Sequence, residues 1–278
     1  MIERGAAVVV VWGVRRSGIH SIVTWLMRLL EPEVWIFNDL SKSVDPGADP
    51  YESLNFSAAY RADLEEQSHC RIPTPADRDT PKSSIVCVYE DSALCSVDIG
   101  HYLGANSKVT HFVTCRDPFN MMASRMKRFQ PCPRTGVIVR ADGSLDPRIL
   151  SPERALNRWV EHATAVRDDG NWPNPNTVGI AFNKFVTDRN FRRELADRVG
   201  RPFDDTGINE VYAAGGGSSF EGTSKHGHAQ EMKINERWIL ARENIEYRSL
   251  FQGRTDILEL SEAVFGPIPG TRELVGCH

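Results

Sequence analysis

The sequence is constrained most by a segment near its start in which a strand pattern, a basic turn and a helix pattern follow one another directly. Residues 6–12 (AAVVVVW) are an unbroken run of apolar and β-branched side chains, which predicts a strand buried on both faces. The turn, residues 13–18 (GVRRSG), has a glycine at each end, and apolar residues recur at helical spacing across residues 19–30. This order predicts an α/β fold with a mainly parallel central sheet.

The same segment has the chemistry of an anion cradle. The turn amides and the helix N-terminus converge on one spot, where the helix dipole favours negative charge. Gly13 and Gly18 have the spacing of the nucleotide-binding P-loop, G-x-x-x-x-G-K-[ST], but Ile19 and His20 stand where Lys and Ser/Thr belong. The lysine that reaches the β/γ-phosphates and the hydroxyl that holds Mg²⁺ are therefore missing. The loop suits a phosphate-type group without a metal ion; the alternative is an ordinary turn with two solvated arginines.

A second motif follows the predicted strand at residues 108–115. Arg116 stands at the carboxyl end of that strand, Asp117 can cap the next helix, and Pro118 can take its first position. Ser124 comes eight residues after Arg116 and falls in that helix. An arginine and a serine so placed can converge on one phosphate. The alternative is a plain helix start whose serine faces solvent.

Taken together, the two motifs resemble those of the sulfotransferases that use 3′-phosphoadenosine 5′-phosphosulfate (PAPS). In that family a basic residue followed by Ser/Thr-Gly-Thr binds the 5′-phosphosulfate, and an Arg and a Ser at this spacing hold the 3′-phosphate. The resemblance implies a single three-layer α/β/α domain over residues 1–278, with a P-loop-like sulfotransferase architecture. It also implies these donor-binding residues: Arg15, Arg16, Ser17, Gly18, Ile19, His20, Ser21, Arg116 and Ser124.

The resemblance further implies a reaction. PAPS would be the sulfuryl donor, adenosine 3′,5′-bisphosphate the product, and a hydroxyl or amine of an unidentified acceptor the target, with a carbohydrate or small molecule favoured. No metal ion is implied. Two other classes stay open: a P-loop nucleotide-dependent kinase or transferase, and a non-catalytic nucleotide binder.

Residues 213–222 (AAGGGSSFEG) match the position of a late glycine-containing loop that closes over the nucleotide in that family. The resemblance implies that Gly217, Ser218 and Ser219 contribute to donor binding, with Lys225 as the nearest accompanying cation. A flexible linker is the alternative. Residues 178–200 resemble a late strand-to-helix unit of the family in pattern only, because the usual Tyr-Glu-Asp-Leu is absent.

The resemblance also implies candidate catalytic groups. Arg16 would stabilise the charge that develops on the bridging oxygen and the leaving phosphate. The resemblance implies a general base after the strand that precedes the Arg116 motif. Glu90 is the first candidate and Asp91 the second, since both stand at the end of the predicted strand at residues 84–89. His20 is the third, because a histidine titrates near neutrality. A helix-capping role is the alternative for either carboxylate.

Composition sets the outer limits. With a net charge of −4 and a pI near 6.1, the chain gives no sign of a general nucleic-acid or membrane partner. The six cysteines have no C-x-x-C spacing and read as reduced thiols. The N-terminal apolar run is too short for a signal peptide, and no stretch is long enough to span a membrane, so we expect a cytoplasmic protein. The late histidines, His226 and His228, are expected to face solvent rather than a metal. The oligomeric state is left open.

The rest of the chain supplies the frame. Further strands are predicted at residues 34–37, 84–89 and 178–182, and helices at 152–166 and 190–199, with two more inside 231–265. A helix is expected to run from about residue 91 toward 100–103. Irregular stretches at 41–83 and 129–152 are expected to be acceptor-binding or lid insertions. The first includes a weak helical piece at 58–66, and the second a hairpin at 136–145.

Overall fold

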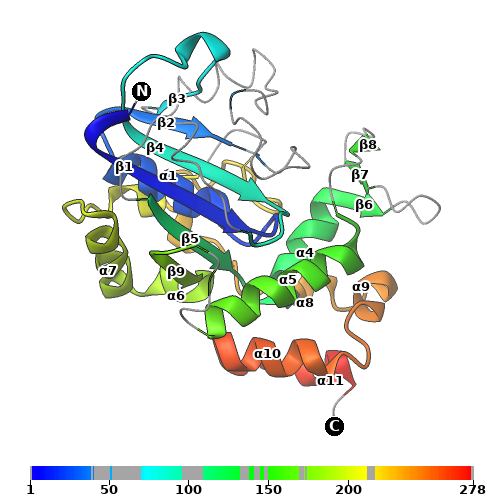
Figure 1. Cartoon of the computed structure of the whole chain (residues 1–278). Coiled ribbons are helices and arrows are strands. Elements are labelled where there is room, and N and C mark those ends of the chain that lie inside the picture. Colours follow the sequence, from blue (N-terminus) through cyan, green and yellow to red (C-terminus); the bar gives the residue numbers. More distant parts are fainter. Residues whose placement is uncertain are drawn as a thin grey trace.

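The protein folds around one six-stranded parallel sheet flanked by helices on both sides (Figure 1). The computed structural model describes residues 2–38, 40, 51, 70–95, 109–131, 138–140, 145–146, 150–168, 172, 174–211 and 217–276. The strand order is β3-β2-β4-β1-β5-β9, and every neighbouring pair is parallel. The expected α/β class is confirmed.

The strands are where the sequence predicts them, apart from one. Their bounds are β1 (Ile2–Gly13), β2 (Val34–Phe37), β3 (Cys70–Arg71), β4 (Lys82–Glu90), β5 (Val109–Cys115) and β9 (Thr177–Ala181). The edge strand β3 was not predicted, because two residues are too few to show a periodic pattern. Since all six strands are parallel, their carboxyl ends meet along one edge, where ligands of such folds bind.

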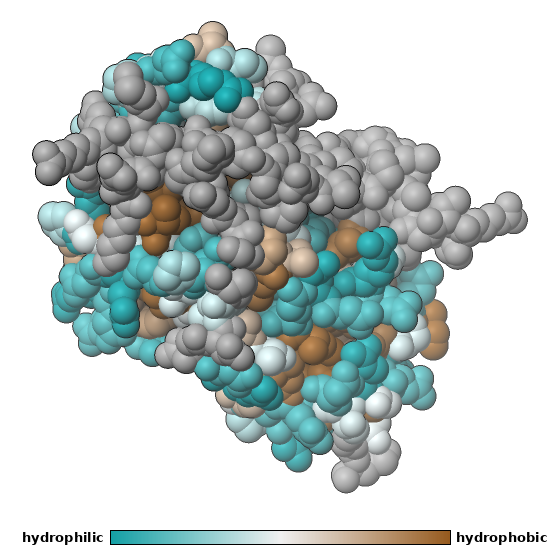
Figure 2. All heavy atoms as spheres, in the orientation of Figure 1, coloured by the Kyte–Doolittle hydropathy of each residue, from teal (hydrophilic) through white to brown (hydrophobic). Residues whose placement is uncertain are grey.

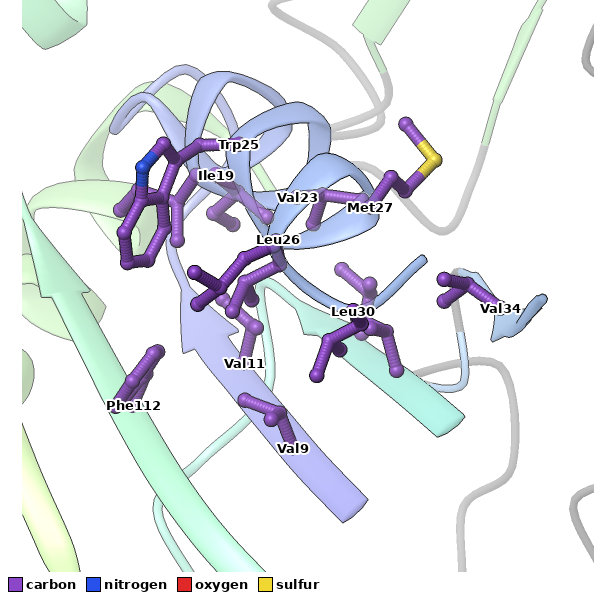
Figure 3. Close-up of a cluster of buried hydrophobic side chains, with 14 of the residues drawn as sticks. Val9, Val11, Ile19, Val23, Trp25, Leu26, Met27, Leu30, Val34 and Phe112 are labelled. Atoms are coloured by element: carbon purple, nitrogen blue, oxygen red, sulfur yellow. The ribbon is translucent and has the colours of Figure 1, made fainter. Parts of the chain in front are cut away.

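One face of the sheet is covered by α1 (Ile19–Leu29), together with α6 (Phe182–Thr187), α7 (Arg189–Val199) and η3 (Thr206–Asn209). Val9 and Val11 of β1 point toward α1 and pack with Leu26 (Figure 3). Burial of each such side chain contributes about 1.5–3 kcal/mol, which fixes α1 on the sheet.

The opposite face takes the alternate residues of β1. Val8, Val10 and Trp12 lie there, and Trp12 stacks on Tyr89 of β4 with ring centroids 4.3 Å apart. Both tryptophans of the first segment, Trp12 and Trp25, are buried core residues. Helix α5 (Pro152–Arg167) covers part of this face.

A second helical cluster lies at the carboxyl-end side of β5. It contains α4 (Pro118–Arg128), α5, α8 (Arg237–Ala241), α9 (Ile245–Ser249), α10 (Thr255–Phe265) and α11 (Thr271–Val275). The expectation of two helices in residues 231–265 is corrected to three, preceded by the 3-10 turn η4 (Ala229–Glu231). Asn244 caps α9 by accepting the Tyr247 N–H (3.0 Å), and Gly253, at φ 75°, separates α9 from α10.

The helix expected from residue 91 onward is wrong where it can be examined. Residues 91–95 are not helical, and Asp91 has a φ of 58°, which a right-handed helix excludes. The rest of that prediction lies outside the described residues, as do the helical piece at 58–66 and most of the stretch at 41–69.

Parts of the two expected insertions are described. The first ends earlier than residue 83, because η2 (Pro75–Asp77) is followed by β4 from Lys82. In the second, β7 (Ile138–Arg140) and β8 (Leu145–Asp146) form the expected antiparallel hairpin, and β6 (Phe129–Pro131) joins it. The turn at residues 142–143 lies outside the described residues.

Figure 2 shows the side chains on the face seen in Figure 1. Hydrophilic residues cover most of its described surface, and apolar ones appear in separate patches. The large apolar side chains that remain exposed in the described chain are Ile239, Leu240 and Ile245, on α8 and α9. None of the described helices is both long and apolar enough to cross a membrane.

Candidate functional site

The cradle is formed where β1 ends and α1 begins. A Cβ on Gly13 would lie 2.6 Å from Ile19 side-chain atoms, so only glycine fits at the end of the strand. Gly18 has a φ of 93°, and a Cβ there would lie 2.3 Å from the ring of Phe182. As the N-cap of α1, Gly18 has no side chain to cap the helix. No side chain of Gly18 therefore caps the helix N-terminus, and an anion site there stays a prediction.

Arg16 and Ser17 occupy the middle of this turn. Arg16 has a left-handed backbone (φ 77°), and its carbonyl oxygen accepts from Arg116 Nη1 at 3.4 Å. Burial lowers the pKa of Arg16 to about 10, despite the opposing effect of Glu90, and the group stays charged at neutral pH. Ser17 is 1% exposed, and its Oγ has no hydrogen-bond partner in the described part of the chain. A buried hydroxyl in this state is uncommon and suits a ligand-binding turn.

A second cluster of polar side chains lies around Ser124. Arg116 leaves the end of β5 and donates through Nη1 to Ser124 Oγ at 3.3 Å, so the structure brings the predicted pair together. Arg237 of α8 donates through Nη1 to the same oxygen at 3.1 Å. Both arginines are buried, at 2% and 7% exposure, and the Nε of each finds no acceptor among the described residues.

Two guanidinium groups lie close together here, with the carboxylate of Glu221 as a counter-charge on Arg237. Burial and, after it, the nearby Arg237 lower the pKa of Arg116 to about 9. Burial also lowers the pKa of Arg237. Both effects penalise the charged guanidinium and are relieved when an anion binds, so the cluster is suited to a phosphate or a similar group.

The elements around this cluster hold the two arginines in place. Asp117 caps α4 by accepting the Asn120 N–H at 2.8 Å, as the sequence predicts. Asn120 Oδ1 in turn accepts the Trp238 N–H at 3.0 Å, which fixes the start of α8 next to α4. Trp159 Nε1 donates to the carbonyl of Arg116 at 2.7 Å.

The late loop, described from Gly217 onward, also contacts the cluster around Ser124. Ser218 Oγ accepts from Arg237 Nη2 at 2.9 Å, and the backbones of Ser218 and Gly222 exchange hydrogen bonds of 2.9 and 3.1 Å. Gly217, at φ 70°, starts this turn, and a Cβ there would lie 2.5 Å from the Gly222 carbonyl oxygen. Ser219 is half-buried, and its Oγ has no partner in the part of the chain described. Residues 212–216 lie outside the described part.

The cation that meets this loop is Arg237, not Lys225. Lys225 is 38% exposed and pairs with Glu231 at 2.6 Å. Sequence reasoning missed Arg237 because it lies in a one-turn helix far along the chain from its partners. The resemblance does indicate a cation beside this loop. The nearest cation in sequence, Lys225, is not the one that contacts Ser218.

The first candidate base, Glu90, lies next to the cradle at the end of β4. Its Oε2 accepts from Arg15 Nε at 3.0 Å, and its Oε1 lies 3.7 Å from His20 Nε2. The Glu90 side chain is 10% exposed and that of His20 is 34% exposed. The structure therefore places Glu90 and His20 side by side at the edge of the cradle.

The second candidate base, Asp91, has a different environment. Its carboxylate accepts two hydrogen bonds from Arg125, at 3.2 and 3.1 Å, and one from the Arg15 backbone N–H at 2.9 Å. Its own N–H donates to the Gly13 carbonyl at 2.9 Å. Burial alone would raise the pKa of Asp91, but Arg125 and Arg15 lower it below its ordinary value. Asp91 thus ties the ends of β1 and β4 together, and the described residues after it, 92–95, are not helical.

The remaining predicted residues of the cradle, Ile19 and Ser21, differ in which of their groups can face a ligand. The Ile19 side chain is buried in the core, so only its backbone can face a ligand. Ser21 lies in the first turn of α1 and donates its N–H to the Gly18 carbonyl at 3.0 Å. His226 is exposed. In the described residues no three His, Cys, Asp or Glu side chains lie close enough to hold a metal ion.

Comparisons with known proteins give little. No protein-family model and no curated protein matches the chain. One similar solved structure is titled "Crystal structure of mouse sulfotransferase SULT7A1 complexed with PAP"; it is 12% identical over 94% of this chain and 90% of that chain, with a TM-score of 0.42. Because the TM-score and the sequence identity are this low, we base the fold and the proposed activity on the residues of this chain.

Proposed function

We propose that the protein is a PAPS-dependent sulfotransferase. The observation that carries the proposal is the convergence of Arg16, Arg116 and Arg237 from three separate elements, linked through Arg16 O and Ser124 Oγ. The buried Nε groups of Arg116 and Arg237 that find no acceptor among the described residues add to it. Such an arrangement favours a ligand with two anionic groups.

The cradle and the cluster around Ser124 would bind the two ends of such a donor. The open N-terminus of α1 and Arg16 would hold the 5′-phosphosulfate, with the backbone amides of residues 17–20 as donors. Arg116, Ser124, Arg237 and the loop at Ser218 would hold the 3′-phosphate. The turn lacks the lysine and hydroxyl of a nucleotide P-loop, which disfavours an Mg²⁺-nucleotide in the same place.

The chemistry would be an in-line transfer controlled by position and charge. The acceptor oxygen or nitrogen forms a bond to sulfur while the bond from sulfur to the bridging oxygen breaks, and adenosine 3′,5′-bisphosphate leaves. Arg16 would stabilise the charge on the bridging oxygen, because a fixed cation aimed at developing charge is an effective form of catalysis.

The acceptor's proton would go to Glu90. Its carboxylate lies at the cradle beside Arg15 and His20, whereas the oxygens of Asp91 already accept three N–H groups. We therefore propose that Asp91 holds the ends of β1 and β4 together and that His20 is the alternative base. The acceptor would be a carbohydrate or a small molecule.

Thermal unfolding with a panel of nucleotides tests the proposal. Adenosine 3′,5′-bisphosphate should raise the melting temperature far more than AMP or ATP with Mg²⁺, because only a ligand that binds both the cradle and the cluster stabilises the native state strongly. Equal shifts with AMP would mean that the 3′-phosphate is not recognised. Transfer of radioactive sulfate from labelled PAPS to an acceptor library would then test turnover.

A further inference from the structure

The cluster around Ser124 also contains a carboxylate, that of Glu221. Glu221 Oε2 lies 2.8 Å from Arg237 Nη2, and Ser218 Oγ donates to the same carboxylate oxygen. The Glu221 side chain is 23% exposed, while that of Arg237 is 8% exposed. The charge of Glu221 also partly offsets the lowering of the Arg116 pKa by burial and by Arg237.

The Nη groups of the two arginines are already engaged. Arg237 donates to Ser124, Ser218 and Glu221, and Arg116 donates to Ser124 and to the backbone carbonyls of Arg16 and Ile234. The Nε of each arginine has no acceptor among the described residues, but a phosphate that also binds the Nη groups would replace some of these acceptors. A serine hydroxyl can turn and donate to the phosphate, and a neutral carbonyl tolerates it.

Of these acceptors, Glu221 is the one that a bound phosphate would displace from Arg237. A carboxylate and a phosphate on the same guanidinium repel each other, and the repulsion is strong where solvent is largely excluded. Glu221 also lies on a short turn next to Gly222, and Gly217, Gly222 and Gly227 all have positive φ, at 70°, 58° and 82°. Glycines at such positions let a loop change its backbone with little steric cost.

We propose that Glu221 is a built-in competitor for the phosphate site, which occupies Arg237 and Ser218 until the 3′-phosphate of the nucleotide displaces it. This inference rests on the proposed function for the identity of the ligand, but not for the competition itself. Glu221 sets the affinity of the cluster: it weakens anion binding, and it can re-enter as the nucleotide product leaves.

The test removes the charge of Glu221 and keeps its shape. Glu221→Gln should bind adenosine 3′,5′-bisphosphate about tenfold more tightly than the wild type in isothermal titration, because the bound form no longer has to displace a charged competitor. Glu231→Gln is the control: it removes a carboxylate ten residues further on that pairs with Lys225 at 2.6 Å, and it should leave the affinity unchanged.

Inorganic pyrophosphate serves as a second probe that does not depend on the nucleotide. If Glu221→Gln strengthens pyrophosphate binding while neither protein binds the bisphosphate, the competitor stands and the proposed function fails. Unchanged or weaker binding of both probes by a folded Glu221→Gln would overturn the inference and make Glu221 an organiser of the loop. Should Glu221→Gln fail to fold, Glu221→Ala is measured in the same way, and the same outcomes decide.

Discussion

The guanidinium groups of Arg116 and Arg237 share one acceptor, the hydroxyl oxygen of Ser124, at 3.3 and 3.1 Å. Two like charges held against one neutral oxygen in a buried setting repel each other, and the lowered pKa of each group reflects its burial. An anion that bridges them would remove both penalties. The pair is therefore the part of the site at which substitution should be most informative.

Replacement of Arg116 by alanine should weaken binding of adenosine 3′,5′-bisphosphate by about 2–4 kcal/mol, because a charge-assisted contact to phosphate is lost. Titration calorimetry measures the change, and Arg272→Ala is the control, since Arg272 pairs with Glu262 at the exposed surface. A loss of stability of similar size with unchanged nucleotide affinity would make Arg116 a structural residue instead.

The base is tested by removing its charge without its shape. Glu90→Gln should keep nucleotide affinity and lower turnover by about 10²–10⁴-fold, the usual contribution of a positioned general base. His20→Asn should mainly disturb donor binding, because His20 lies in the first turn of α1. Steady-state kinetics with a working acceptor measure both. If Glu90→Gln stays active and His20→Asn abolishes turnover at unchanged donor affinity, then His20 is the base.

Much of the frame was predictable because it is local. The strand-turn-helix segment can be predicted because its residues are contiguous. The Arg116–Ser124 pair can be predicted because its members are only eight residues apart. The short edge strand β3 and the one-turn helix α8 were not, because elements of two to five residues carry no periodic signal.

The missing parts of the site were those that depend on tertiary contacts. Arg237 meets Ser124 across 113 residues, and Arg125 meets Asp91 across 34. No spacing rule connects such pairs, so their partners become visible only when α4, α8 and the end of β4 are packed together. The distinction between Glu90 and Asp91, adjacent in sequence, also came from their different neighbours in space.

Asp91→Asn should destabilise the fold rather than act on the chemical step alone. The pair formed by Asp91 and Arg125 is buried, with side-chain exposures of 4% and 1%, and removal of one partner of such a pair costs about 3–5 kcal/mol. Urea unfolding measures the loss, with Asp168→Asn as the control because its pair with Arg167 is exposed. Wild-type stability combined with abolished turnover would return Asp91 to the list of candidate bases.

Stability should fall in mild acid because two histidines are buried in the neutral form. Burial lowers the pKa of His111 and of His162 to about 4. Trp12 Nε1 donates to His111 Nδ1 at 3.3 Å, which requires that nitrogen to be unprotonated. His162 Nε2 lies 3.0 Å from the Ser92 carbonyl and carries the proton, while its Nδ1 has no partner among the described residues.

The sign and size follow from proton uptake. Between about pH 6.5 and 4 the unfolded chain binds protons at these histidines and the native state does not, so the free energy of unfolding falls as the pH falls. Each histidine contributes up to roughly 3 kcal/mol across that window. Chemical unfolding at pH 7.5 and pH 4.5 measures the difference. His111→Gln and His162→Gln should each reduce it by about half, and His226→Gln, an exposed control, should leave it unchanged. An undiminished pH dependence in both buried variants would show that other groups govern acid unfolding.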